Sequence, residues 1–165
     1  MEHEPPKSRA RIWLSVLLLI VYAAFVLVVT MSPIPVDSGY QNAISKALAV
    51  AHRHGVPQSF GYNKLEFTAN IAMFVPLGFL IALALPQKVW WLVLVIAPAF
   101  SGAIELTQGA VLPHRFEDIS DFISNSIGGY IGAFFAVLLR AVVNARDETV
   151  VRRAIWEYEQ GRFTV

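Results

Sequence analysis

Polar side chains that could do chemistry stand at the ends of apolar segments. Three sets of carboxylates and amides recur at helical spacings of three or four residues: Glu66 and Asn70; Glu105 and Gln108; and Asp118, Asp121 and Asn125. Each set would share one face of a helix. Such a face points into protein or water, because carboxylates and amides without partners are costly in hydrocarbon. The sets could bind a ligand, exchange a proton as general acid or base, or form a hydrogen-bond network that fixes helix packing.

The composition places these faces in an integral membrane protein. Of the 165 residues, 56% are hydrophobic and 15% are charged, and the mean hydropathy is +0.54. Soluble domains are less apolar and more highly charged than this. The net charge of +1 gives no support for nucleic-acid binding. The chain has no cysteine, which excludes disulfides and thiolate chemistry.

Four apolar runs predict an all-α membrane protein with four transmembrane helices. They cover residues 12–31, 67–85, 89–106 and 119–143, and about twenty residues are enough to cross a bilayer core. The first run is interpreted as an uncleaved helix, because it is longer than the apolar part of a signal peptide and does not end in a small-residue cleavage site.

Shorter surface helices are predicted in the first loop and in the C-terminal tail. Ile44, Leu48 and Ala51 recur on one side of the loop segment, which Gly55 could end. The tail after Asn144 repeats this mixture of apolar and basic residues. The expected organisation is a cytoplasmic N-terminus over 1–11, a transmembrane domain over 12–143 and a cytoplasmic tail over 144–165.

The basic residues predict the orientation. With both termini cytoplasmic, nine lie inside and four outside: Lys7, Arg9, Arg11, Lys88, Arg140, Arg146, Arg152, Arg153 and Arg162 against Lys46, Arg53, Lys64 and Arg115. Basic residues are enriched on the cytoplasmic side of membrane proteins, so this arrangement is favoured. The second helix then begins, the third ends and the fourth begins at the outer face. All three polar sets therefore fall at one level of the membrane.

Proline and glycine residues suggest how the helices bend and pack. Pro76 is expected to kink the second helix, because proline lacks a backbone donor. Gly78, Gly128 and Gly132 are interpreted as packing positions, where the absence of a side chain lets helices approach closely.

Three motifs carry a resemblance to a known family. They read Asn70-x-x-x-Phe74-x-Pro76-Leu77-Gly78-Phe79, Glu105-x-x-Gln108 and Arg115-x-x-Asp118-x-x-Asp121-x-x-x-Asn125-x-x-Gly128-x-x-x-Gly132. In their order and placement the chain resembles the VanZ-like bacterial membrane proteins over about residues 64–139. The resemblance implies a small multi-pass protein of the bacterial cytoplasmic membrane, in a family whose namesake is associated with resistance to the glycopeptide teicoplanin. It marks seven polar positions as family-matching: Asn70, Glu105, Gln108, Arg115, Asp118, Asp121 and Asn125.

These positions together with Glu66 form the candidate site, and three functions stay open for it. The first is binding or modulation of an envelope lipid, a cell-wall precursor or a glycopeptide antibiotic. The second is an enzyme acting on a lipid-linked envelope intermediate, with a carboxyl group as acid or base. The third is a structural polar network without a ligand.

The acid excess of the site limits what could bind there. A phosphate group would be repelled unless carboxyl groups were protonated or a divalent cation intervened, and magnesium or calcium would suit oxygen ligands. His52 and His54 are not predicted to be metal ligands, because residues two apart on a helix face different directions.

Overall fold

The computed structural model describes residues 9–32, 39–111 and 119–161, and this part of the chain is helical without strands. The segments in chain order are α1 (Arg9–Thr30), α2 (Gln41–Arg53), α3 (Tyr62–Ala84), the 3-10 helix η1 (Gln87–Leu92), α4 (Val93–Val111) and α5 (Ile119–Glu159). Four candidate membrane spans lie within the described residues: α1, α3, α4 together with η1, and α5. The prediction of an all-α fold with four spans is therefore confirmed.

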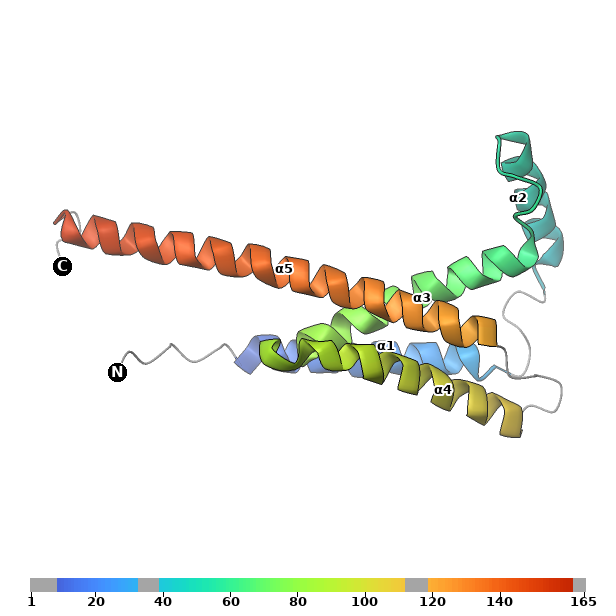
Figure 1. Ribbon diagram of the computed structural model, residues 1–165, viewed down its shortest axis with the longest axis horizontal. Helices are drawn as coiled ribbons and strands as arrows, with labels where there is room; N and C mark the ends of the chain where they lie inside the picture. Colours follow the sequence, from blue (N-terminus) through green and yellow to red (C-terminus); the bar gives the residue numbers. More distant parts are fainter. Residues whose placement is uncertain (1–8, 33–38, 112–118, 162–165) are drawn as a thin grey trace.

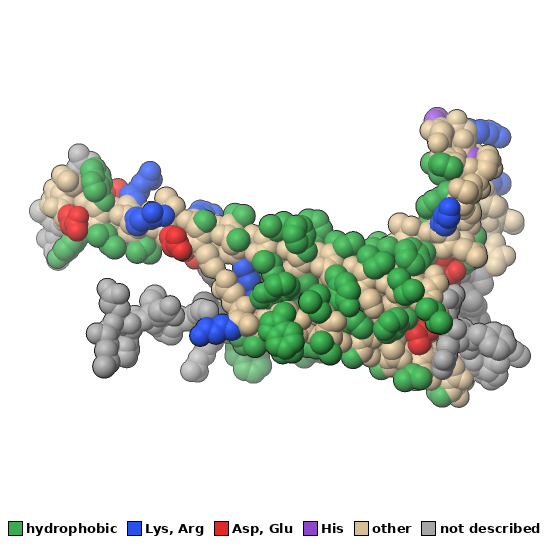
Figure 2. All heavy atoms as spheres, in the orientation of Figure 1, with side chains coloured by type: hydrophobic (Ala, Val, Ile, Leu, Met, Phe, Trp, Pro, Cys, Tyr) green, Lys and Arg blue, Asp and Glu red, His purple; other side chains and the backbone are tan. Residues whose placement is uncertain are grey.

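The four long helices run side by side along one axis, while α2 lies across that axis at one end (Figure 1). The beginning of α1 and the end of α5 lie at the opposite end (Figure 1). Hydrophobic side chains cover the middle of the bundle, and Lys and Arg side chains are seen toward its two ends (Figure 2). An apolar band between charged ends is typical of a bundle that crosses a bilayer.

The most extensive helix contact is between α3 and α5, and glycine makes it possible. A Cβ added at Gly78 would collide with the backbone of Gly129, and one added at Gly132 would collide with the carbonyl oxygen of Val75. A Cβ at Gly128 would come within 2.8 Å of the Phe74 Cβ. These two helix backbones thus touch directly, as small residues allow in membrane proteins.

Two prolines lie inside spans, and neighbouring tyrosines bond to carbonyls close to them. Pro98 in α4 has no N–H to offer the carbonyl of Leu94 four residues earlier, and the Tyr130 hydroxyl donates to that oxygen at 3.2 Å. In α3, the Tyr22 hydroxyl donates to the Met73 carbonyl at 2.9 Å, three residues before Pro76. Bonds from neighbouring helices are one way in which proline is tolerated within a membrane span.

Arg140 closes the other end of α3. Its guanidinium donates to the carbonyl oxygens of Leu83 at 2.9 Å and Leu85 at 2.7 Å. The last carbonyls of a helix have no partner within the helix. Arg140 of α5 supplies a hydrogen-bond donor for them here. Its positive charge also interacts favourably with the negative end of the α3 helix dipole.

The tail and the first loop differ in detail from the sequence interpretation. The tail is helical as predicted, but it continues α5 without a break and ends before Gly161, whose φ is +65°. In the loop, α2 ends at Arg53, one residue before His54 and two before Gly55, whose φ is +98°. The positive φ at Gly55 matches the predicted end of that helix, because glycine adopts this conformation readily.

Candidate functional site

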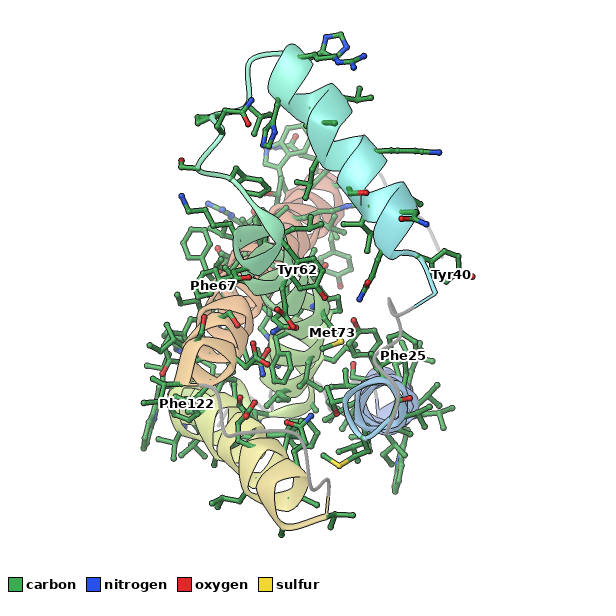
Figure 3. All side chains as sticks on the ribbon, turned by 90° about the vertical axis from the view of Figure 1, so that its right-hand side faces the viewer. Phe25, Tyr40, Tyr62, Phe67, Met73 and Phe122 are labelled. Carbon is green, nitrogen blue, oxygen red and sulfur yellow. The ribbon has the colours of Figure 1, made fainter. Side chains whose placement is uncertain are left out.

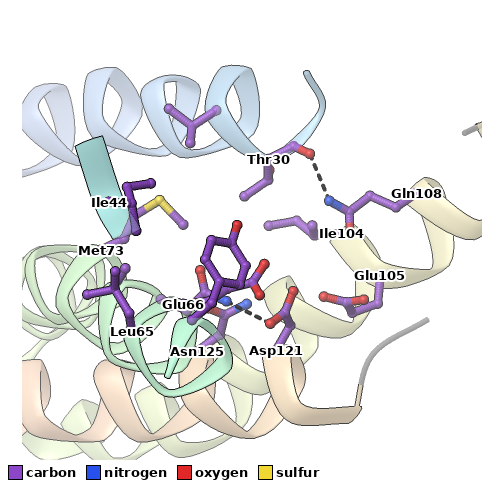
Figure 4. A pocket seen from close by; sticks show the side chains of 14 residues that line it. Thr30, Ile44, Leu65, Glu66, Met73, Ile104, Glu105, Gln108, Asp121 and Asn125 are labelled. Atoms are coloured by element: carbon purple, nitrogen blue, oxygen red, sulfur yellow. Dashed lines mark hydrogen bonds between the residues drawn. The ribbon is translucent and has the colours of Figure 1, made fainter. Parts of the chain in front are cut away.

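The end of the bundle that carries α2 contains a cavity of about 260 Å³ (Figure 4). It is bounded by the end of α1, the first half of α3, the last turns of α4 and the start of α5, with Ile44 of α2 on its edge. Six of the predicted site residues line it: Glu66, Asn70, Glu105, Gln108, Asp121 and Asn125. Three polar sets far apart in sequence thus meet in one space.

Asn70 and Asp121 join α3 to α5 at the cavity. The Asn70 side-chain amide donates to the Asp121 carboxylate at 2.7 Å, and both side chains are partly buried. Glu66 lies one turn before Asn70 on the same face of α3 and also lines the cavity, although it is exposed. Glu66 and Asn70 therefore lie together at the cavity, as their spacing of four residues predicted.

The last turns of α4 present a buried polar face. Glu105 is 8% exposed and Gln108 is 6% exposed. The Gln108 side-chain amide donates to the Thr30 carbonyl at the end of α1, at 2.7 Å (Figure 4). This bond satisfies one of the last carbonyls of α1, which otherwise lack helical partners. It also links α4 to α1 beside the cavity.

Asn125 is the most deeply buried polar residue among the described residues of the cavity wall, with 3% of its surface exposed. Its side-chain nitrogen donates to the Ser101 hydroxyl oxygen at 3.0 Å. Its carbonyl oxygen Oδ1 is buried and has no hydrogen-bond partner among the described residues. Buried polar atoms in folded proteins nearly always have a partner, so this acceptor needs an explanation.

The other wall of the cavity is apolar. Val29 of α1, Leu65 and Met73 of α3, and Ile104 of α4 line it together with Ile44 of α2. Figure 3 looks onto this end of the bundle and shows Met73 on the side of α3 that faces α1. The cavity is therefore lined by carboxylates and amides from α3, α4 and α5, and by aliphatic side chains from α1, α2, α3 and α4.

The comparison with protein families agrees with this architecture. A family model described as VanZ/LLP1 matches residues 16–140. The chain belongs to the VanZ/LLP1 family. The match includes every described residue that lines the cavity, and it extends the sequence resemblance back over most of α1 and all of α2. No curated protein and no solved structure matches the chain.

Two predicted site residues of this VanZ/LLP1 protein, Arg115 and Asp118, lie outside the described residues. The sequence interpretation missed two others that bond to the site, Ser101 and Thr30. Ser101 had a signal, because it precedes Glu105 by four residues and so shares its helix face. Thr30 had none, since its contribution is a backbone carbonyl.

The described residues also bear on the metal hypothesis. No group of three or more His, Cys, Asp or Glu side chains in this part of the VanZ/LLP1 chain is arranged to hold a metal ion. His52 instead makes a contact of 3.0 Å from Nε2 to the Phe60 carbonyl, which fastens the segment after α2. The carboxylates of the cavity are spread over three helices rather than gathered around one point.

Proposed function

We propose that this VanZ/LLP1 protein binds an amphipathic molecule of the cell envelope in the cavity at the α2 end. The observation that carries the proposal is the two-sided wall, which pairs carboxylates and amides with aliphatic side chains in one space of about 260 Å³. Small-molecule sites are mostly apolar with a few polar groups that fix orientation, and their volumes begin near 300 Å³. A polar head group with an attached hydrocarbon chain matches such a wall.

Helix packing explains part of the polar set, and a ligand would explain the remainder. The amides of Asn70, Gln108 and Asn125 each tie two helices together. A network made only for packing would be closed, because an unsatisfied buried group costs stability. The open cavity and the acceptor Oδ1 of Asn125 are the features that a packing role leaves unexplained.

The loose attachment of α1 supports entry from the bilayer. Only 6% of the apolar window of α1 is buried within the bundle, compared with 28% for α3 and 33% for α5. Helix α1 packs mainly on α3. A lipid chain could therefore reach the cavity beside α1 without unpacking the α3–α5 pair.

The basic residues favour the outer side of the bacterial cytoplasmic membrane for this site, with both termini cytoplasmic. The 3-10 helix η1, which carries Lys88, and the extension of α5 with its basic residues lie at the end opposite the cavity (Figure 1). Arg140 belongs to the same end, because it bonds to the last carbonyls of α3. That is the distribution expected of a cytoplasmic end. Envelope lipids, cell-wall precursors and lipid-bearing glycopeptides such as teicoplanin are amphipathic molecules found on the outer side, so they are the candidate ligands.

The test is to fill the cavity and measure bound amphiphile. Ala69 lines the cavity, and Ala69→Trp would occupy it with an indole ring. Ala99→Trp is the matched control, at an exposed position of α4 outside the cavity lining. Each protein is purified from bilayers of phosphatidylethanolamine and phosphatidylglycerol, and lipid adducts are counted by native mass spectrometry, without and with added teicoplanin.

We expect adducts on the natural sequence and on the Ala99→Trp protein, and their loss from the folded Ala69→Trp protein. Equal adducts on all three proteins would contradict a ligand site in this cavity. The same conclusion would follow if none of the three retained lipid or teicoplanin.

A further inference from the structure

Helix α2 has an apolar stripe that the rest of the described chain leaves exposed. Tyr40 at its start and Val50 near its end are 66% and 50% exposed. Two alanines between them, Ala43 and Ala47, are also exposed. Spacings of three, four and three residues place these four side chains on one side of the helix. This exposed stripe is therefore available to a partner outside the chain.

The neighbouring stripe of α2 faces the protein. Ile44, Leu48 and Ala51 are half-buried, and Ile44 borders the cavity. The Ala51 carbonyl also accepts a bond of 3.1 Å from the backbone N–H of Val56, so the segment after the helix folds back against it. These contacts hold α2 in one orientation, and with it the direction of the exposed stripe.

The direction of α2 matches the surface of a bilayer. The helix lies across the axis along which the four candidate spans run (Figure 1). It is therefore close to parallel with the membrane plane at the end of the bundle. Its 13 residues make a helix of about 20 Å. Helices in this direction that have one apolar and one polar side bury the apolar side at the boundary between head groups and acyl chains.

The charges near the exposed stripe favour one class of lipid. Between Gly39 and Leu65 the sequence contains no Asp or Glu and three basic residues, Lys46, Arg53 and Lys64. Lys46 and Arg53 belong to α2 itself; both are exposed, and neither forms an ion pair with a described residue. Positive charge beside an apolar helix face attracts anionic head groups. A second copy of α2 would carry the same charge and would be repelled.

We infer that α2 docks into the surface of an anionic phospholipid bilayer. The exposed stripe lies at the acyl-chain boundary, where tyrosine is a favoured residue, as Tyr40 would be. Lys46 and Arg53 extend their charged ends to the lipid phosphates. Binding of an amphiphile in the cavity is not required for this docking, so its test is independent of the proposed function.

Single spin labels measure the depth of each side of α2. The chain has no cysteine, so Ala47→Cys and Ala49→Cys each give one site for a nitroxide on the full chain. Both alanines are exposed, and residues two apart on a helix face different directions, so Ala49 is the matched control on the polar side. The proteins are placed in nanodiscs of phosphatidylcholine with phosphatidylglycerol. Relaxation of the nitroxide is compared for oxygen, which concentrates in the bilayer, and for a water-soluble nickel complex.

We expect oxygen to relax the label at position 47 more strongly than the nickel complex does, and the reverse at position 49. Lys46→Gln and Arg53→Gln should each lower the equilibrium constant for immersion of the label at position 47 by roughly fivefold. Discs of phosphatidylcholine alone should lower it as well. Arg153→Gln, at an exposed position of the α5 extension, is the matched control and should leave it unchanged.

Immersion at position 47 that depends on phosphatidylglycerol and on both basic side chains supports the inference. Equal access of the nickel complex to positions 47 and 49 would overturn it, because the exposed stripe would then face water. Equal immersion with and without phosphatidylglycerol would overturn the selection of anionic lipid. Magnetic coupling between labels on two chains, without immersion, would show that a second copy covers the stripe instead. None of these results alters the test of the cavity by Ala69→Trp.

Discussion

The glycine contact between α3 and α5 gives a quantitative prediction about the stability of the helix pair that positions Asn70 and Asp121. A Cβ at position 132 would meet the Val75 carbonyl oxygen and would approach the Phe79 nitrogen to 2.6 Å. Both are backbone atoms, so the helices themselves must separate. Overpacking typically costs about 1–3 kcal/mol. The better helix propensity of alanine offsets about 0.5–1 kcal/mol of that cost, so Gly132→Ala should lose stability overall.

Gly102→Ala is the matched control, because its added Cβ would meet only the ring edge of Phe122, at 3.7 Å. We expect this variant to unfold at or slightly above the temperature of the natural sequence, and Gly132→Ala to unfold roughly 5 °C below it. The assay is thermal unfolding in detergent, followed by tryptophan fluorescence. Equal melting temperatures for the two variants would refute the direct backbone contact on which the positions of Asn70 and Asp121 depend.

Three other outcomes follow from the fold. Cysteines introduced at Ala110 and Gln87 should differ in intact cells, with only the first labelled by an impermeant thiol reagent; the reverse pattern would invert the orientation. Tyr130→Phe should cost about 0.5–1.5 kcal/mol and become neutral when Pro98→Ala restores the N–H donor of α4; an unchanged cost would show that the tyrosine does not serve that carbonyl. Arg140→Met should lower the unfolding temperature in detergent by several degrees, by removing the partners of two carbonyls at the end of α3, and no change would show that the cap is dispensable.

The sequence predicted the spans well because their physical signal is strong. A bilayer demands about twenty apolar residues from each crossing helix, and few other structures give that pattern. The tail shows where composition misled. The change at Asn144 from apolar to charged residues suggested a separate helix, but no glycine or proline occurs between Ala133 and Gln160. Nothing in that stretch breaks a helix, so α5 continues through it.

The sequence predicted only part of the site. Spacings of three and four residues placed Glu66 with Asn70 and Glu105 with Gln108 on shared faces, because helix geometry is local. Which partner each side chain meets depends on how the helices cross, and spacing does not give that. The bond from Asn125 to Ser101 is an example, since it joins α5 to α4 across 24 residues of sequence.

A crystal structure of the full chain grown in a lipidic phase is the most direct test of ligand binding in the cavity. We expect ordered density for an amphiphile, with its head group between Glu105 and Asp121 and its hydrocarbon chain along Val29 and Met73. Density for water alone, or a cavity closed by the side chains of α1 and α3, would contradict it.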